Sequence, residues 1–100
     1  MIYYTQLIFI KKGKEDAFNA FEEKVLPLLG AHEGELIYRL RPGAASLIAG
    51  SGQLPYEIHL VSFTCKADFE DYKNDPKRLA FTEEKNNSVE KVMLIEGAEI

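Results

Sequence analysis

The sequence contains little cysteine, no tryptophan and no excess of basic residues. Cys65 is its single cysteine, so no disulfide can form within the chain, as is usual for proteins of the reducing cytoplasm. Twelve basic residues against sixteen acidic residues give a formal net charge of -4. This balance argues against nucleic acid and against anionic membranes as partners, because both bind basic surfaces. We therefore predict a cytoplasmic protein with neither partner.

The sequence also lacks a long hydrophobic segment. The apolar start over residues 1–10 reaches Lys11 and Lys12 too early to span a bilayer, and it has neither the basic beginning nor the cleavage site of a signal peptide. What the chain does have is a composition that is 46% hydrophobic and 28% charged over 100 residues. This composition is typical of a globular protein, and residues 1–100 are predicted to form one domain.

Hydrophobic periodicity predicts four strands and two principal helices. Aromatic and β-branched residues favour strands at 2–10, 35–41, 56–63 and 89–96. A helix is predicted over 14–29 because Phe18, Phe21, Val25 and Leu28 recur at helical spacing. Pro27 should kink this helix or end it near residue 26. The second helix is predicted to begin at 64–65 and to end at 74–76.

Three connecting segments complete the predicted chain. Residues 77–85 are expected to form a short helical turn, and residues 86–88 to turn the chain into the last strand. Residues 42–55 carry glycine and proline but no clear pattern, which leaves a hairpin loop or a short extra strand at 47–49 as alternatives. Gly30 is a plausible end for the first helix. The resulting order, β-α-β-β-α-β, is that of the ferredoxin-like motif, an α+β fold with a four-stranded antiparallel sheet and both helices on one face.

A sheet with helices on one face leaves its other face open. Strands 2–10, 56–63 and 89–96 are apolar on both faces, so the open face would present a large hydrophobic patch to water. A second copy of the chain, related by a two-fold axis, would cover it. The alternative is that central strands of any small sheet look apolar on both sides. We predict a homodimer.

Four stretches of the sequence resemble the dimeric α+β-barrel superfamily, in particular an uncharacterised small-domain branch related to antibiotic-biosynthesis monooxygenases. They are the first strand with its Lys-Lys-Gly end, VLPLLGAHEGEL, PYEIHLVSF and FEDYKNDPKRLAF. In the last stretch, Phe69, Tyr72, Asp75 and Pro76 fit a Phe-x-x-Tyr-x-x-Asp-Pro pattern. The resemblance implies a dimer whose two sheets close into a barrel, with a cleft between helices and sheet in each subunit. Some such proteins oxidise aromatic substrates, and some bind haem.

The polar residues on the apolar strands are the candidate site. Alternation places Glu57 and His59 on one face of the third predicted strand, and Arg39 or Arg41 on the neighbouring strand is expected opposite them. This Glu-His-Arg group would hold an anionic or phenolic ligand, with His59 as the catalytic proton acceptor. Tyr4 and Gln6, on the adjacent first strand, would add hydrogen bonds as ligand-binding residues. The alternative is a structural cross-strand ion pair between Arg39 and Glu57.

Other candidates are weaker. His32 is either near the mouth of a cleft or a solvated turn residue. Cys65, at a helix start, is either a nucleophile or a small residue at the cap. The segment Gly50-Ser51-Gly52 is either a lid or a plain connection. Two histidines and one cysteine, widely spaced, supply no zinc site, so we predict no metal and no cofactor, with haem as a minor alternative.

The sequence therefore leaves three functional hypotheses. The first is an enzyme that oxidises a small apolar or aromatic molecule in a cavity between sheet and helices. The second is a dimer that binds such a molecule without turnover. The third is a purely structural dimer. Polar residues on otherwise apolar strands argue against the third, and the absence of a convergent acid, base and nucleophile leaves the first two open.

Overall fold

The computed structural model describes residues 1–100. Four strands and four α-helices are joined by short connections, including two 3-10 segments. In chain order they are β1 (Ile2–Ile10), α1 (Glu15–Val25), the 3-10 segment η1 (Leu26–His32), β2 (Gly34–Leu40), the 3-10 turn η2 (Ala44–Ser46), β3 (Glu57–Phe63), α2 (Lys66–Lys73), α3 (Pro76–Leu79), α4 (Thr82–Ser88) and β4 (Val89–Gly97). The predicted β-α-β-β-α-β order is confirmed, with α3 and α4 as additions before the last strand.

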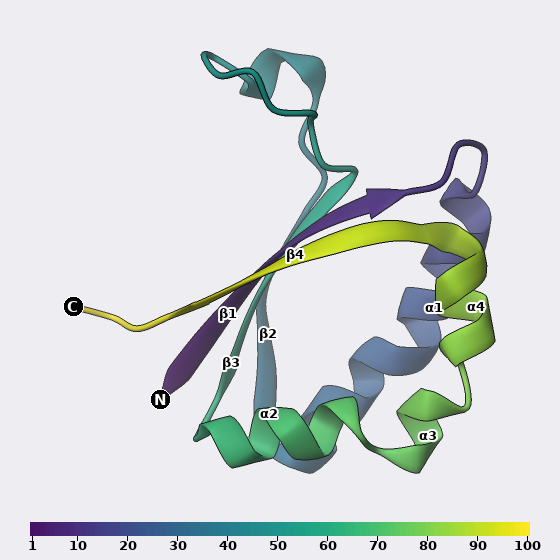
Figure 1. The fold of residues 1–100 in the computed structure, drawn as a ribbon. Coiled ribbons are helices and arrows are strands. Elements are labelled where there is room, and N and C mark those ends of the chain that lie inside the picture. The colour runs from purple at the N-terminus through teal and green to yellow at the C-terminus, as the bar shows by residue number, and fades with distance from the viewer.

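The strands form one antiparallel sheet in the order β2-β3-β1-β4. Figure 1 shows all four α-helices on the same side of this sheet, while the other side is covered by no element. The core lies between the two layers. Its buried apolar residues are Tyr4, Ile8, Phe9, Phe18, Phe21, Val25, Leu29, Val61, Phe63, Phe69 and Tyr72. None of the helices combines the length and the apolar character that crossing a bilayer requires.

The first helix changes character at the predicted proline. Regular α-helix ends at Val25, and the chain continues as the 3-10 segment η1 with Pro27 in its first turn. Proline lacks the N–H that an α-helix needs at this position, so the end near residue 26 follows from its chemistry. Gly30 does not end the segment. Glu33 does, with a left-handed φ of 58°.

Strand β2 contains a β-bulge that the sequence pattern missed. Leu36 pairs with Val61, whereas Tyr38 pairs with Leu60, so the register shifts by one residue between them. Val61 faces the helices and Leu60 faces the open side. Leu36 and Tyr38 therefore lie on opposite faces of the sheet, although strict alternation along a single strand would place them on the same face, because a bulge breaks that alternation.

Two connections also differ from the predictions. Residues 86–88 are not a turn but the last residues of α4, whose final hydroxyl, on Ser88, donates to the carbonyl of Glu84 at 2.9 Å. The 42–55 segment forms no extra strand. It contains only the turn η2 and extends beyond the end of the sheet (Figure 1), leaving Ile48 almost fully exposed.

Candidate functional site

Four polar side chains, from β2, from β3 and from Arg41 just after β2, meet at the helix-facing side of the sheet. Arg39 Nε donates to Glu57 Oε2 at 2.8 Å, and Arg41 Nη2 donates to Glu57 Oε1 at 2.7 Å. His59 Nε2 is hydrogen-bonded to the same Glu57 carboxylate. Glu57 and His59 are almost completely buried, whereas the two arginines reach the surface. The sequence prediction that an arginine lies opposite Glu57 or His59 is thus confirmed in its geometry.

The charge states of this group follow from burial and hydrogen bonding. Burial by itself would raise the pKa of Glu57, but the hydrogen bonds from Arg39, Arg41 and His59 outweigh it, and the pKa is lowered. Burial lowers the pKa of His59 despite the opposing effect of Glu57. His59 is therefore neutral near pH 7. Because an ionised carboxylate only accepts hydrogen bonds, His59 Nε2 carries the proton and Nδ1 is left as an acceptor.

The two arginines are engaged by Glu57 and form the ion pair that the cross-strand alternative described. Arg41 additionally donates to Asn19 at 2.9 Å and lies over the ring of Tyr56, 4.6 Å from its centroid. Neither arginine lines the cavities between sheet and helices. In this arrangement they neutralise Glu57 and are not positioned to hold a ligand anion in the cleft.

The two candidates on β1 have different surroundings. Gln6 pairs with His59 across the sheet and lines the space under the helices. Tyr4 does not line it. Its ring stacks on Phe69 with centroids 3.8 Å apart, and its hydroxyl donates to Glu96 at 3.1 Å. The structure therefore places Tyr4 in the core and Gln6 at the cleft.

A cleft lies between the sheet and the helices. We use this name for two adjacent cavities, of about 180 Å³ and about 20 Å³, which share the lining residues Gln6, Glu22, Tyr72 and Arg78. The larger cavity is bounded mainly by apolar side chains, and the smaller one also contacts His59. The remaining lining residues of the larger cavity are Ile8, Phe21, Phe69, Lys73, Lys85, Val89, Val92 and Leu94.

Glu22 is a functional candidate that is not among the residues predicted from the sequence. It lies on α1, is 7% exposed and forms no hydrogen bond or ion pair with another residue. Burial raises its pKa to about 7, with a further increase from Glu57, and the cations Arg39, Arg78 and Lys85 only partly oppose this. A carboxyl group with a pKa near neutrality, facing an apolar cleft, is suited to proton transfer.

Two cations face the same cleft. Arg78, on α3, has a buried Nε without a hydrogen-bond partner, and its guanidinium lies over Tyr72, 5.0 Å from the ring centroid. Lys85, on α4, is partly buried. Burial and the nearby Arg78 lower its pKa, while Glu22 opposes this. Arg78 also contacts the Tyr72 hydroxyl. The cleft thus combines an apolar wall with a carboxyl group and a lysine that form no ion pair, and with an arginine whose Nε has no acceptor.

The other sequence candidates lie away from the cleft. His32 is not a free turn residue, because its Nε2 pairs with Asp75 Oδ2 at 2.7 Å, and Asp75 in turn caps α3 by accepting from the backbone N–H of Lys77. Cys65 is exposed, and its thiol donates to Asp68 at 3.4 Å. No three His, Cys, Asp or Glu side chains are grouped as metal ligands would be.

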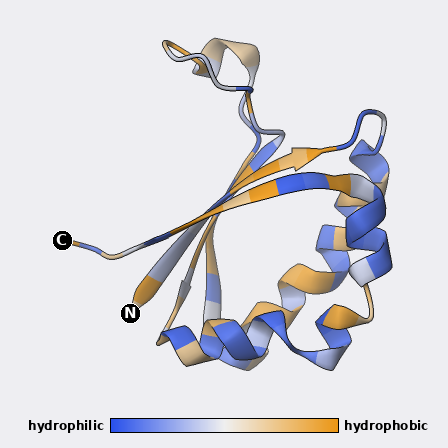
Figure 2. Cartoon of the chain, viewed as in Figure 1, coloured by the Kyte–Doolittle hydropathy of each residue, from blue (hydrophilic) through white to orange (hydrophobic).

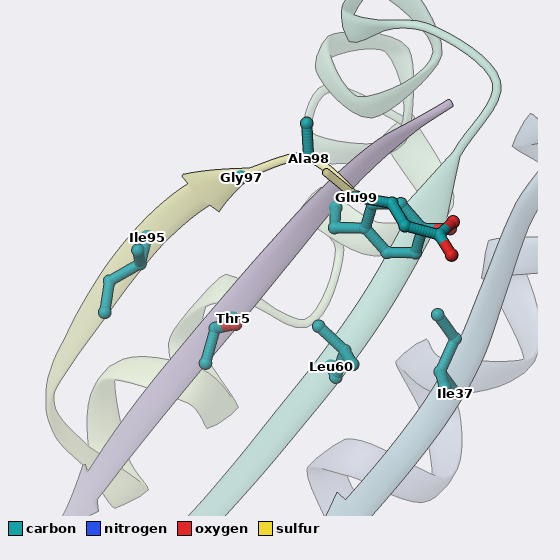
Figure 3. A pocket seen from close by; sticks show the side chains of 8 residues that line it. Thr5, Ile37, Leu60, Ile95, Gly97, Ala98 and Glu99 are labelled. Carbon is teal, nitrogen blue, oxygen red and sulfur yellow. The ribbon is translucent and has the colours of Figure 1, made fainter.

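The open face of the sheet carries a separate apolar groove of about 490 Å³. Figure 3 shows Thr5, Ile37, Leu60 and Ile95, contributed by all four strands, along this groove. Hydrophobic colouring follows much of β1 and β4 in Figure 2. Several large apolar side chains on this face are about half exposed: Tyr38, Leu40, Met93 and Ile95. An exposed apolar area of this kind is unusual for a monomer.

Comparison with known proteins finds similar solved structures but no similar sequence family. No protein-family model and no curated protein matches the chain. An uncharacterized NIPSNAP domain protein from Burkholderia xenovorans has 16% identity and a TM-score of 0.75, over 100% of this chain and 95% of that one. A DABB-family protein with a ferredoxin-like fold from Mesorhizobium loti has 18% identity and a TM-score of 0.69, over 99% and 96%. A dimeric protein of unknown function from Bacteroides fragilis, also with a ferredoxin-like fold, has 13% identity and a TM-score of 0.71, over 98% and 95%.

At these identities the similarity establishes the fold and nothing finer. The chain has the ferredoxin-like α+β fold, as its strand order and these structures together show. The predicted fold class is confirmed, and the resemblance seen in the sequence holds at the level of the ferredoxin-like fold.

Proposed function

We propose that this chain binds a small, largely apolar molecule in the cleft between its sheet and its helices. The observation that carries this proposal is the set of polar groups left without partners inside an apolar cavity: the Glu22 carboxyl, Arg78 Nε and Lys85. Buried polar groups without partners cost stability, and folded proteins retain them mainly where function uses them. A purely structural dimer would have no use for this arrangement.

The cavity volume limits the ligand. Pockets for drug-sized molecules measure roughly 300–1,000 Å³, whereas an engineered apolar cavity of about 150 Å³ holds one benzene molecule. A cavity of about 180 Å³ therefore suits a molecule the size of a single substituted ring. The apolar wall formed by Phe21, Phe69 and Val92 would contact the ring.

The cleft also supports proton transfer. Glu22, with a pKa of about 7, would donate or accept a proton near neutrality, and the acceptor nitrogen of neutral His59 would serve as a base on the sheet side. In this proposal burial keeps His59 neutral, the hydrogen bond to Glu57 fixes its tautomer, and Gln6 orients the ligand. The oxidation of an aromatic molecule, implied by the family resemblance, stays a prediction.

Ligand binding is tested by titrating the isotope-labelled protein with benzamide and following backbone amide shifts by NMR. Val92 and Met93 are neighbours on β4 that face opposite sides of the sheet. Val92→Phe should fill the cleft and abolish the shifts of cleft residues, whereas Met93→Phe should leave them unchanged. If wild-type cleft amides respond neither to benzamide nor to its carboxylate counterpart benzoate at millimolar concentration, the proposal is wrong. Native mass spectrometry of the purified protein would then identify any resident ligand, and incubation would show whether it is chemically altered.

We further propose a homodimer formed through the open face of the sheet. The half-exposed apolar residues and the groove in Figure 3 support it, and the Bacteroides fragilis protein with the same fold is described as dimeric. Ile95 on this face and Leu79 on the helix side are 50% and 49% exposed. By sedimentation at micromolar concentration, wild type and Leu79→Glu should be dimers and Ile95→Glu a monomer. A monomeric wild type would refute the proposal.

A further inference from the structure

We propose that the ligand of the cleft is an anion, a compact carboxylate the size of a single-ring aromatic acid, held by Arg78 and Lys85. This inference rests on the function proposed above and adds the chemical class of the ligand. The two cations come from α3 and α4, and both face the cavity that Phe21, Phe69 and Val92 line with apolar surface. The ring would pack on this surface while the carboxylate meets the cations.

Arg78 is the strongest indication of a missing acceptor. Its Nε is buried and has no hydrogen-bond partner in the chain. A buried donor without a partner destabilises the folded chain, and a guanidinium is shaped to donate two parallel hydrogen bonds to a carboxylate. A ligand carboxylate would satisfy Nε, which the chain itself does not.

The other cations near the cleft are already engaged. Arg39 and Arg41 bind Glu57, and Lys73 forms an ion pair with Glu70 at 3.2 Å. Lys85 has no such partner, and its charge adds to that of Arg78 from the neighbouring helix. The arrangement therefore leaves two cations, both facing one cavity, for a ligand of opposite charge.

Glu22 does not supply that opposite charge. It lies within the same cleft but forms no ion pair with Arg78 or Lys85, and it faces a set of groups from every neighbouring element: Gln6 of β1, Arg39 of β2, Glu57 and His59 of β3, Tyr72 of α2, Arg78 of α3 and Lys85 of α4. Burial holds a large share of it in the neutral acid form near pH 7. A neutral Glu22 would donate a hydrogen bond to a bound carboxylate, whereas an ionised one would repel it.

The test compares benzoate with benzamide, which have nearly the same shape but differ in charge. Both are titrated into the full-length chain near neutral pH, with amide shifts of cleft residues as the readout. Charge-assisted hydrogen bonds of about 1.5–3 kcal/mol predict that benzoate binds about tenfold tighter or more. Arg78→Gln and Lys85→Gln should each remove most of this preference. Lys77→Gln, an exposed change beside Arg78, should preserve it.

The outcomes separate the two proposals. If benzamide binds in the cleft as tightly as benzoate, the inference of an anion is overturned while the binding function stands. If neither probe shifts cleft amides, both are overturned. If Arg78→Gln keeps the full preference for benzoate, the assignment of Arg78 is wrong. The comparison of the two probes on wild type needs no variant, so it decides the ligand class even where a substituted chain does not fold.

Discussion

The replacement of Glu22 by glutamine is the most direct test of the cleft's electrostatics. Glutamine has nearly the same shape as the neutral acid but cannot ionise. In the folded chain the pKa of Glu22 is raised from 4.5 to about 7, chiefly by burial. Each pKa unit corresponds to ~1.36 kcal/mol of difference between the two protonation states. The rise therefore represents a destabilisation of about 3 kcal/mol once Glu22 is ionised in both the folded and the unfolded chain.

The sign of the pH dependence follows from proton binding. Between pH 4.5 and about 7 the folded chain holds the Glu22 proton while the unfolded chain has released it. The folded state binds more protons, so the contribution of Glu22 to stability falls as pH rises through this interval. Below the interval the penalty is absent, and above it the penalty is complete. Glu22→Gln should thus match wild type near pH 4.5 and exceed it by about 3 kcal/mol near pH 8.

The assay is urea denaturation followed by far-ultraviolet circular dichroism, at one fixed protein concentration and a series of pH values. Fixed concentration matters because self-association would otherwise change the apparent stability. Glu23→Gln is the matched control, since Glu23 is the next residue on α1 but is exposed. A stability difference between Glu22→Gln and wild type that stays constant with pH would refute the reasoning, because it would mean that Glu22 titrates alike in both states.

Two further predictions concern the framework around the cleft. Glu57→Gln should lower the free energy of unfolding by about 2 kcal/mol or more, because it removes the negative charge that Arg39, Arg41 and the neutral His59 surround. The control is Glu35→Gln, at an exposed position on β2. Equal urea midpoints for the two variants would contradict this expectation. Gly34→Ala should cost about 1–3 kcal/mol, because its Cβ would lie 2.7 Å from Cε1 of Phe63, whereas Gly52→Ala meets nothing within 4 Å. Equal thermal midpoints for the two alanine variants would contradict this expectation, because they would show that Phe63 moves aside at no cost in stability.

The strands and the helix boundary were predictable because their signals are local. Strands at 2–10 and 56–63 follow from residue type and alternation, and the change at Val25 follows from Pro27 two residues later. The bulge in β2 was not predictable in the same way. It is a property of the pairing with β3, and a single strand read on its own alternates without interruption.

Some residues of the candidate site could be predicted from the sequence and others could not. Arg39 and Glu57 could be placed together because the second and third strands are neighbours in this fold. The sequence does carry a signal for Glu22, because it lies four residues after Phe18 and three before Val25, which places a charged residue on the buried face of α1. Arg78 could not be found this way, because α3 spans only four residues and tertiary packing alone determines where it faces.

The alternation of β1 and β3 connects the cleft to the open face of the sheet. Gln6 and His59 pair across the strands and line the cleft, while Thr5 and Leu60 pair one position away and line the groove on the opposite side. A second copy of the chain on the open face would therefore leave the cleft accessible, because no residue lines both spaces. The second copy would also restrict the movement of β1 and β3, which carry Gln6 and His59. The uncharged polar groups of the cleft would then come from the sheet, and the groups free to contact a ligand, Glu22, Arg78 and Lys85, from the helices.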